Sequence, residues 1–220
     1  MPKGRDIRRI TTVMTAYIFG AGELNGPAPS PQAGDMVLAA DGGWRHVKRL
    51  GLSAGVVIGD FDSLEFSSGF DCEAIRLPRE KDVTDMAAAI EIALARGFKR
   101  FVLYGGAGGR LDHTMANIQS LVWLSRRGAK GFLWCGGRVA TALTNGQIAF
   151  AECETGYISV FAHSGKAYGV SLEGLKYELK DAVLSDESPI GVSNEFLGRR
   201  SIVAVCRGTL VIMYEKETPI

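Results

Sequence analysis

Two short apolar runs, each followed at once by acidic and glycine residues, limit the fold of this chain most strongly. Residues 36–40 are followed by Asp41-Gly42-Gly43, and residues 56–58 by Gly59-Asp60-Phe61-Asp62-Ser63. Continuous apolar runs of this length are typical of strands that are buried on both faces of a parallel sheet. Residues 44–50, between the two clusters, have the length of a short crossover helix. We therefore predict two parallel strands with acids at their carboxyl ends.

These acids are predicted to lie close together. In open α/β sheets the ligand crevice lies just outside the carboxyl ends of the strands, where Asp41, Asp60 and Asp62 would converge. In an extended chain the side chains of Asp60 and Asp62 point the same way and can share one hard cation. Asp and Gly are also common in turns after strands, and each cluster alone fits that interpretation equally well. Two clusters in register favour a metal and phosphate site.

Strand and helix patterns alternate up to about residue 135. The other predicted elements are strands at residues 16–19, 74–77, 101–104 and 131–134 and helices at residues 85–96 and 113–127. This alternation predicts βαβ units and a doubly wound, mostly parallel sheet. The crossover at residues 20–35 contains Pro27, Pro29 and Pro31, so we expect a loop there.

From about residue 136 onward the pattern changes to short β-rich segments. Residues 157–162, 166–172, 201–206 and 210–214 read as strands that are separated by glycine-containing turns. We predict a second, antiparallel β domain over residues 137–220 after an α/β domain over residues 1–136. No low-complexity linker separates the two, so we expect them to pack against each other.

A third acidic cluster, Glu80 to Asp85, lies directly before the alanine-rich helix. Asp82 is placed to serve as the N-cap, with Asp85 three residues later in an approximate capping box. For this motif alone we favour that capping role. It leaves Asp85 free to face the crevice as a further ligand for magnesium.

A glycine-rich segment, Gly105 to His113, joins a predicted strand to the next helix. Glycines let the backbone approach a phosphate, while a helix N-terminus beside Arg110 offers amide donors and a forked cation. The glycine spacing fits neither a dinucleotide-binding fingerprint nor a P-loop. His113, in the first turn of a helix, is more often a cap or a packed polar residue, so we leave it outside the catalytic set.

Composition and charge exclude some classes of function. The chain is 46% hydrophobic and 22% charged, as is typical of soluble globular proteins, and its net charge of +1 gives no reason to expect nucleic-acid or membrane binding. The basic residues 1–9 lead into no plausible signal peptide or membrane span. Cys72, Cys135, Cys153 and Cys206 lack the spacing of a zinc site, so we interpret them as reduced thiols of a cytoplasmic protein.

With these clusters in this order, the chain resembles the thiamine pyrophosphokinase family in its bacterial form. The resemblance also includes Asn117, the segment Glu173-Gly174-Leu175-Lys176-Tyr177 and the pair Ser193-Asn194. It spans nearly the whole chain. It implies an α/β catalytic domain that binds ATP and Mg²⁺, followed by a β-sandwich that binds thiamine.

The resemblance implies transfer of the terminal pyrophosphoryl group of ATP to the hydroxyl of thiamine, giving thiamine diphosphate and AMP. Its implied metal ligands are Asp60, Asp62 and Asp85, which with Asp112 form the implied catalytic set. The implied nucleotide-binding residues are Asp41, Gly42, Gly105, Gly106, Arg110, Asp112 and Asn117. The implied thiamine-binding residues, contributed across a homodimer interface, are Ser171, Tyr177 and Asn194.

Alternatives remain open at this point. A related pyrophosphotransferase or hydrolase would use the same site on another acceptor, and a non-catalytic sensor would bind nucleotide or thiamine without turnover. A sensor has no need for the complete set of metal-binding acids, which argues against it. Asn194 is also a plausible turn residue, and Tyr177 a half-buried strand residue. The identity of a general base is not determined by the sequence.

Overall fold

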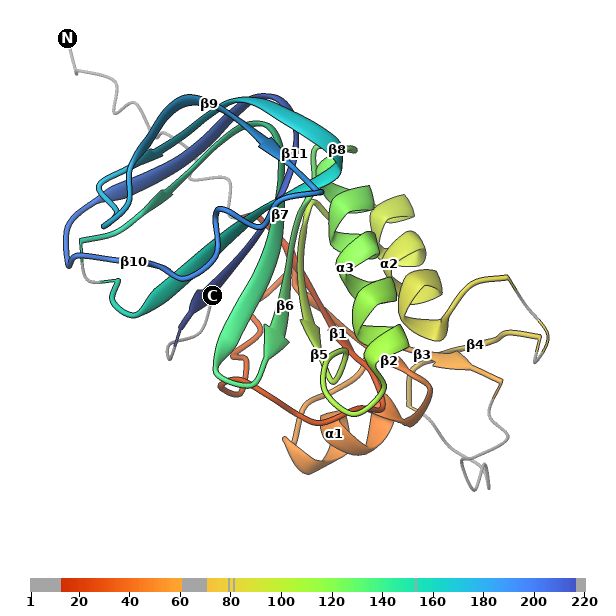
Figure 1. Ribbon diagram of the computed structural model, residues 1–220. Coiled ribbons are helices and arrows are strands. Elements are labelled where there is room, and N and C mark those ends of the chain that lie inside the picture. Colours follow the sequence, from red (N-terminus) through yellow and green to blue (C-terminus); the bar gives the residue numbers. More distant parts are fainter. Residues whose placement is uncertain (1–12, 61–70, 79, 81, 153, 217–220) are drawn as a thin grey trace, which may run out of the picture.

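The computed structural model describes residues 13–60, 71–78, 80, 82–152 and 154–216 (Figure 1). The N-terminal strands are β1 (Thr15–Phe19), β2 (Met36–Ala40), β3 (Val56–Gly59), β4 (Glu73–Arg76), β5 (Arg100–Tyr104) and β6 (Lys130–Cys135). The C-terminal strands are β7 (Arg138–Phe150), β8 (Tyr157–Glu173), β9 (Leu179–Ser185), β10 (Asn194–Glu195) and β11 (Ser201–Glu215). The helices are the short 3-10 turn η1 (Asp41–Gly43), α1 (Trp44–Arg49), α2 (Asp85–Ala95) and α3 (Leu111–Ser125).

A mixed sheet runs through the described residues in the order β10-β8-β11-β7-β6-β5-β1-β2-β3-β4, and β9 pairs with β8 outside this path. The strands from β6 to β4 pair in parallel, whereas β6 pairs with β7, and the strands beyond β7 pair with one another, in antiparallel fashion. The predicted fold class, a parallel α/β part followed by an antiparallel β part, is confirmed. The division into domains at residues 136 and 137 stays a prediction.

The order in which strands are added to the sheet reverses at β1. From β1 it proceeds outward through β2, β3 and β4, and then it returns to place β5 and β6 on the other side of β1. The strand β3 is buried along its whole length, and β2 is buried from Val37 onward. This burial on both faces explains why polar and apolar residues do not alternate in either strand. A topological switch point therefore lies between β1 and β5, where open sheets of this kind bind ligands.

Helices cover both faces of the parallel part. Figure 1 shows α2 and α3 side by side, and their buried residues, including Ile90 and Leu121, pack with Ile18 and Leu38 of the sheet. On the opposite face Val47 of α1 belongs to the other core cluster. The predicted start of α3 at residue 113 is wrong by two positions, because the helix already begins at Leu111, directly after its N-cap.

The proline-rich crossover at residues 20–35 forms no helix, as predicted, and it packs against the core through its middle. The Tyr104 hydroxyl donates to the carbonyl of Pro27 at 3.2 Å. A Cβ on Gly26, which has φ +89°, would lie 2.3 Å from the ring of Trp134. The loop therefore lies directly on two aromatic side chains, and glycine permits this close contact.

The antiparallel part consists of long, bent strands, and this corrects the sequence prediction. Residues 157–162 and 166–172 were predicted as two strands but form the continuous strand β8, and residues 201–206 and 210–214 are both part of β11. The register shifts between Val205 and Thr209 of β11, around Gly208 with φ +123°. The glycine there accommodates a bulge instead of a turn, so the strand bends and continues. Strands β7, β9 and β10 were not predicted.

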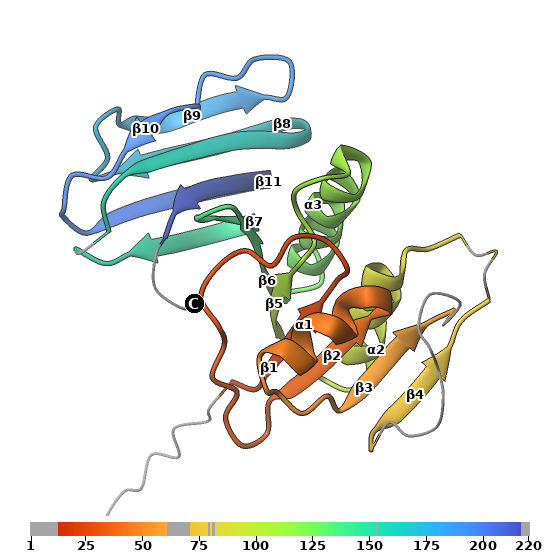
Figure 2. The same ribbon diagram turned by 90° about the horizontal axis from the view of Figure 1, so that it is seen from below.

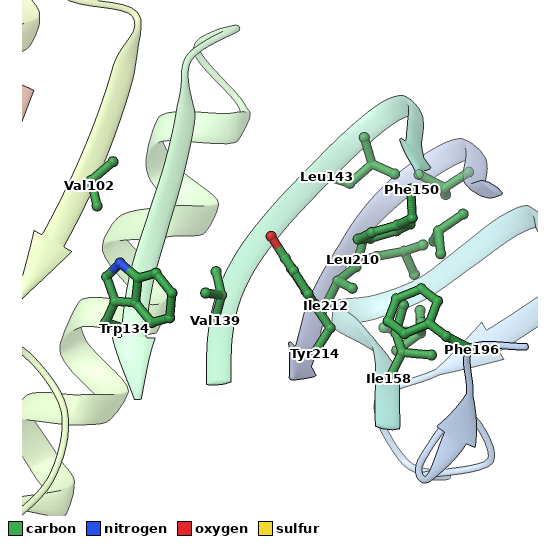
Figure 3. Packing of buried hydrophobic residues seen from close by; sticks show 14 of the residues in the cluster. Val102, Trp134, Val139, Leu143, Phe150, Ile158, Phe196, Leu210, Ile212 and Tyr214 are labelled. Carbon is green, nitrogen blue, oxygen red and sulfur yellow. The ribbon is translucent and has the colours of Figure 1, made fainter. Parts of the chain in front are cut away.

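The two parts pack against each other, as expected from the missing linker. One of the two hydrophobic core clusters, which also includes Phe19, extends from Val102 of the parallel sheet through Trp134 and Val139 to the rings of the antiparallel part (Figure 3). There the ring of Phe150 lies 5.1 Å from those of Phe196 and Tyr214. Figure 2 shows the antiparallel strands extending away from the parallel sheet beyond β6 and β7.

Candidate active site

A crevice of about 710 Å³ lies at the carboxyl ends of β1, β2 and β5, at the switch point of the sheet. Its walls come from the segments after these strands and from the first turns of α2 and α3. The lining residues are Gly20, Ala21, Gly22, Glu23, Ala40, Asp41, Thr84, Asp85, Met86, Gly105, Gly106, Gly108, Gly109, Arg110, His113 and Asn117. Of the three acids predicted to converge, Asp41 lines the crevice, Asp60 does not, and Asp62 lies outside the described residues, so their convergence stays a prediction. Asp85 also lines the crevice.

Glycines permit the close approach of the three strand ends. The amide of Gly22 donates to the carbonyl of Gly105 at 2.9 Å. A Cβ on Gly105, which has φ +61°, would lie 2.3 Å from the carbonyl oxygen of Gly20. A Cβ on Gly43 would lie 1.9 Å from the carbonyl oxygen of Phe19. Side chains at these positions would push the strand ends apart, so the glycines are a requirement of the crevice itself.

Asp41 is one of the acidic residues that line the crevice. It is the first residue of η1, adopts φ +48° and lines the crevice, whereas Gly42 packs against Ala21 behind it. Asp60 follows β3, whose last residue, Gly59, is so close that a Cβ on it would lie 3.3 Å from the Cα of Asp41. The backbone thus brings Asp60 near Asp41, although Asp60 is not a lining residue. Asp62 lies outside the described residues.

Asp85 reaches the crevice as the first residue of α2. The predicted N-cap Asp82 is wrong, because Thr84 occupies that position and its Oγ1 accepts a hydrogen bond from the amide of Ala87 at 3.1 Å. Thr84 has the extended backbone of an N-cap, and its hydroxyl satisfies one of the unpaired amides of the first turn. The shift leaves Asp85 inside the helix terminus, where its negative charge is favourable.

Arg110 and Asp112 form an exposed, bidentate ion pair at the start of α3. Arg110 Nε donates to Asp112 Oδ1 at 3.2 Å, and Arg110 Nη2 donates to Oδ2 at 2.5 Å. Hydrogen bonding to Arg110 lowers the pKa of the Asp112 carboxyl, and the same bond raises the pKa of the guanidinium. Arg110 lines the crevice and Asp112 does not, so Asp112 holds the guanidinium beside the crevice from outside.

The glycine-rich segment after β5 is fixed to α3 by Asn117. This side chain is 4% exposed, and its Nδ2 donates to the carbonyl of Gly106 at 2.7 Å. Gly105 and Gly106 line the crevice together with Asn117. Asn117 therefore fixes the backbone of the glycine-rich segment where it lines the crevice.

Among the lining residues with polar side chains, three were not assigned to the site from sequence: Glu23, Thr84 and His113. Thr84 was overlooked in favour of Asp82, and His113 was set aside as a cap. Glu23 lies in the proline-rich loop, and its carboxylate is beside Gly108, whose Cβ would be 3.2 Å from Glu23 Oε2. No local pattern in the sequence signals this contact, since it depends on how the loop returns to the strand ends.

The three predicted thiamine-binding residues do not line the crevice of their own chain. Ser171 lies on β8, and its Oγ accepts a hydrogen bond from the amide of Asp181 at 3.3 Å. Tyr177 is 60% exposed, whereas Asn194 is buried. Asn194 Oδ1 accepts from the Tyr177 amide at 2.9 Å, and Asn194 Nδ2 donates to the Tyr177 carbonyl at 2.6 Å. Asn194 thus fixes the backbone of an exposed tyrosine.

The donor chemistry of the acidic side suits a hard cation. Asp41, Asp60 and Asp85 carry the carboxylate oxygens that Mg²⁺ prefers, and the first and last of these line one crevice. Within the described residues, which exclude Asp62, no group of three His, Cys, Asp or Glu residues is arranged as a metal site. None of the helices in the described residues has the length and apolar character needed to cross a membrane.

Comparisons with known proteins agree in both parts of the chain. The family model described as "Thiamin pyrophosphokinase, catalytic domain" matches residues 31–133, and the model "Thiamin pyrophosphokinase, vitamin B1 binding domain" matches residues 146–209. Thiamine pyrophosphokinase from Bacillus subtilis is 28% identical over 172 residues, which are 74% of this chain and 80% of that protein.

Solved structures show the same fold. The crystal structure of the Bacillus subtilis thiamine pyrophosphokinase superposes with a TM-score of 0.80 at 24% identity, covering 93% of this chain and 100% of that one. The yeast thiamin pyrophosphokinase superposes with a TM-score of 0.71 at 15% identity, covering 93% and 86% of the two chains. At these identities the structures support the fold alone.

Proposed function

This chain belongs to the thiamin pyrophosphokinase family, and from this membership we infer that its crevice is where ATP and thiamine react to give thiamine diphosphate and AMP. The observation that carries the inference is the coincidence of two independent results. The catalytic and vitamin B1 binding models match in order along the chain, and a glycine-lined crevice with acids and an arginine lies at the switch point of the sheet.

The reaction requires a bond to form and another to break at the β-phosphorus of ATP. The hydroxyl oxygen of thiamine attacks this phosphorus, the bond to the oxygen bridging the α- and β-phosphates breaks, and AMP leaves with that oxygen. The hydroxyl proton passes to a carboxylate of the crevice. Negative charge accumulates on the transferred group, so positioned donors and cations accelerate the reaction more than a covalent nucleophile would.

We assign the phosphate contacts to the segment after β5. Gly105 and Gly106 let their backbone approach the polyphosphate, and the N-terminus of α3 adds a favourable dipole. Arg110 presents a guanidinium to the crevice, and Asp112 sets the orientation of its planar fork. On the acidic side Asp41 and Gly42 complete the nucleotide site.

Asp60, Asp62 and Asp85 are the residues that would hold Mg²⁺. A bound Mg²⁺ neutralises polyphosphate charge and lowers the barrier to attack at phosphorus. Asp85 is supported by its place in the crevice, and Asp60 by the proximity of Gly59 to Asp41.

Thiamine carries a fixed positive charge on its thiazolium ring, which favours a crevice lined by Glu23, Asp41 and Asp85. We assign recognition of its pyrimidine ring to Ser171 and Tyr177, with Asn194 fixing the tyrosine backbone. These residues are absent from the crevice of their own chain, and Tyr177 is exposed. Both facts support a homodimer in which each crevice receives Tyr177 of the partner subunit.

We also propose that the protein is cytoplasmic. The described cysteines, Cys72, Cys135 and Cys206, are free thiols, as is typical of reducing compartments. No nucleic acid or membrane is needed as a partner.

The test is chromatography of reactions that contain the purified protein, ATP and magnesium, with and without thiamine, and with a chelator control. We expect AMP and thiamine diphosphate to appear together, only with thiamine and only with magnesium. AMP formation without thiamine would instead identify a hydrolase or an enzyme for another acceptor. Nucleotide binding without any product would identify a sensor.

A further inference from the structure

We propose that His46 of α1 is a positioning residue for the nucleotide site, because it holds the crevice wall formed by residues 20–23. This inference rests on the proposed function in one respect, namely that the crevice binds ATP. His46 does not line the crevice and would touch neither substrate. It would act through Gly22, which does line the crevice.

The contact is a short hydrogen bond between distant parts of the chain. His46 Nε2 lies 2.7 Å from the carbonyl oxygen of Gly22. A carbonyl oxygen can only accept a hydrogen bond, so the imidazole carries a proton on Nε2 and donates it. On its other side Gly22 is also bound, since its amide donates to the carbonyl of Gly105 at 2.9 Å. Both backbone polar groups of Gly22 are therefore fixed, one by α1 and one by the segment after β5.

This wall needs support from outside because its own residues have few side chains that could hold it in place. Gly20 and Gly22 carry no side chains and gain more conformational freedom on release than other residues do. Ala21, Gly22 and Glu23 are exposed. A bond from the neighbouring helix reduces this freedom before the ligand binds, so that binding does not have to order the wall.

The contacts of Gly22 with the segment after β5 show why its position matters. Gly105 belongs to the glycine-rich segment that we assign to the phosphates, and it touches both Gly20 and Gly22. Gly22, together with Gly20, therefore sets how closely the loop approaches the segment after β5. A shift of this residue changes the crevice on the nucleotide side and leaves the loop of Tyr177 unaffected.

A second anchor of the same loop provides a matched control. The Tyr104 hydroxyl donates to the Pro27 carbonyl at 3.2 Å, farther along the loop and outside the crevice lining. Tyr104→Phe removes this bond but keeps the ring, which stacks on Phe19 at 4.9 Å. His46→Ala and Tyr104→Phe thus each remove one hydrogen bond from the loop, and only the first acts at the crevice.

The test measures the Kd of a non-hydrolysable ATP analogue with Mg²⁺ by calorimetry, together with the KM values of ATP and thiamine. His46→Ala should weaken binding of the analogue and raise the KM of ATP by roughly three- to ten-fold, the range for one lost hydrogen bond. The KM of thiamine at saturating ATP should stay unchanged. His46→Gln, which can place an amide donor near the Nε2 position, should recover most of the affinity. Tyr104→Phe should leave both KM values unchanged.

The proposal is overturned if His46→Ala binds the analogue as the wild type does, or if Tyr104→Phe weakens it equally. Failure of His46→Gln to improve on His46→Ala would also contradict it. Calorimetry without thiamine separates this proposal from the proposed function. A wild-type protein that binds the analogue but makes no thiamine diphosphate refutes the function alone, whereas absence of nucleotide binding refutes both.

Discussion

The parallel and antiparallel parts of the molecule place their functional groups in different ways. In the parallel part Asp41, Gly105 and Arg110 follow different strands or precede a helix, and the topology itself brings them to one crevice. In the antiparallel part Tyr177 lies on a loop that is fixed by side-chain hydrogen bonds from Asn194. Tyr177 is 60% exposed and does not line the crevice of the same chain.

The described residues of one chain bring the proposed nucleotide-binding groups together at a crevice, but not the proposed thiamine-binding residues. The proposed nucleotide side has walls, glycines and charged groups from the same chain. The proposed thiamine side depends on Tyr177, which lies outside the crevice of its own chain, and this supports our proposal of a homodimer.

Replacement of Asp85 by Asn should abolish the chemistry while keeping the fold. Asp85 lines the crevice, and loss of a group that holds the charge-stabilising ion reduces turnover by at least about 100-fold. The matched control is Glu91→Gln, which removes the same charge from an exposed position of α2. Turnover and circular dichroism of both variants provide the measurement. Turnover of Asp85→Asn within a few-fold of the wild type would remove Asp85 from the metal site.

Replacement of Tyr177 by Ala should change the KM of thiamine but not that of ATP. Loss of a stacking face for a heterocycle should raise the KM of thiamine by roughly ten-fold and leave the KM of ATP unchanged. Tyr168→Ala is the control, because Tyr168 is also an exposed tyrosine but its ring packs against Arg207. An equal effect of both variants, or a rise in the KM of ATP, would contradict the division between the two halves.

Replacement of Asn194 should reveal the support behind Tyr177. Asn194→Ala leaves the amide and carbonyl of Tyr177 without these partners. We therefore expect the free energy of unfolding, measured in urea, to fall by about 1–3 kcal/mol. We also expect a several-fold higher KM of thiamine. Asn194→Asp keeps the acceptor for the Tyr177 amide but puts a buried, charged acceptor oxygen against the Tyr177 carbonyl, so it should destabilise the fold at least as much as Asn194→Ala. If Asn194→Asp were as stable as the wild type, the bond from Asn194 Nδ2 would not explain the role of this residue.

The smallest expected effect concerns pH. Because the bond to Arg110 lowers the pKa of Asp112 in the folded state, this carboxylate stays ionised as the pH falls to the ordinary range of aspartate, near about 4. Its ion pair should therefore persist from neutral pH down to that range and break only below the lowered pKa. Arg110→Gln should move the titration of Asp112 upward, as measured by carboxyl NMR. An unchanged titration would show that the ion pair does not form in solution.

Much of the parallel part could be predicted from the sequence, because its signals are local. The apolar runs of β2 and β3 and the acids after them lie within a few residues of each other. The antiparallel part was harder, since a glycine such as Gly208 looks the same in a turn and in a bulge. The sequence favoured Asp82 as the N-cap of α2. Thr84 is also a good N-cap residue, and only the backbone conformation decides between the two.

Contacts between segments far apart in sequence could not be predicted. Glu23 and His46 both depend on how the proline-rich loop returns to the strand ends, and no periodicity or motif records that path. The position of Asn194 was recognised through the family resemblance, but its pairing with the Tyr177 backbone required the structure.

The most direct test of the proposed two-chain site is complementation between two impaired variants. Asp85→Asn and Tyr177→Ala are co-expressed with different tags, purified through both tags, and assayed at a low thiamine concentration. If the crevice of one subunit uses Tyr177 of its partner, each mixed dimer has one intact site and should show about half the wild-type activity. If Tyr177 serves its own chain, the mixed dimer has no intact site, and its activity will not exceed that of the two variants measured separately.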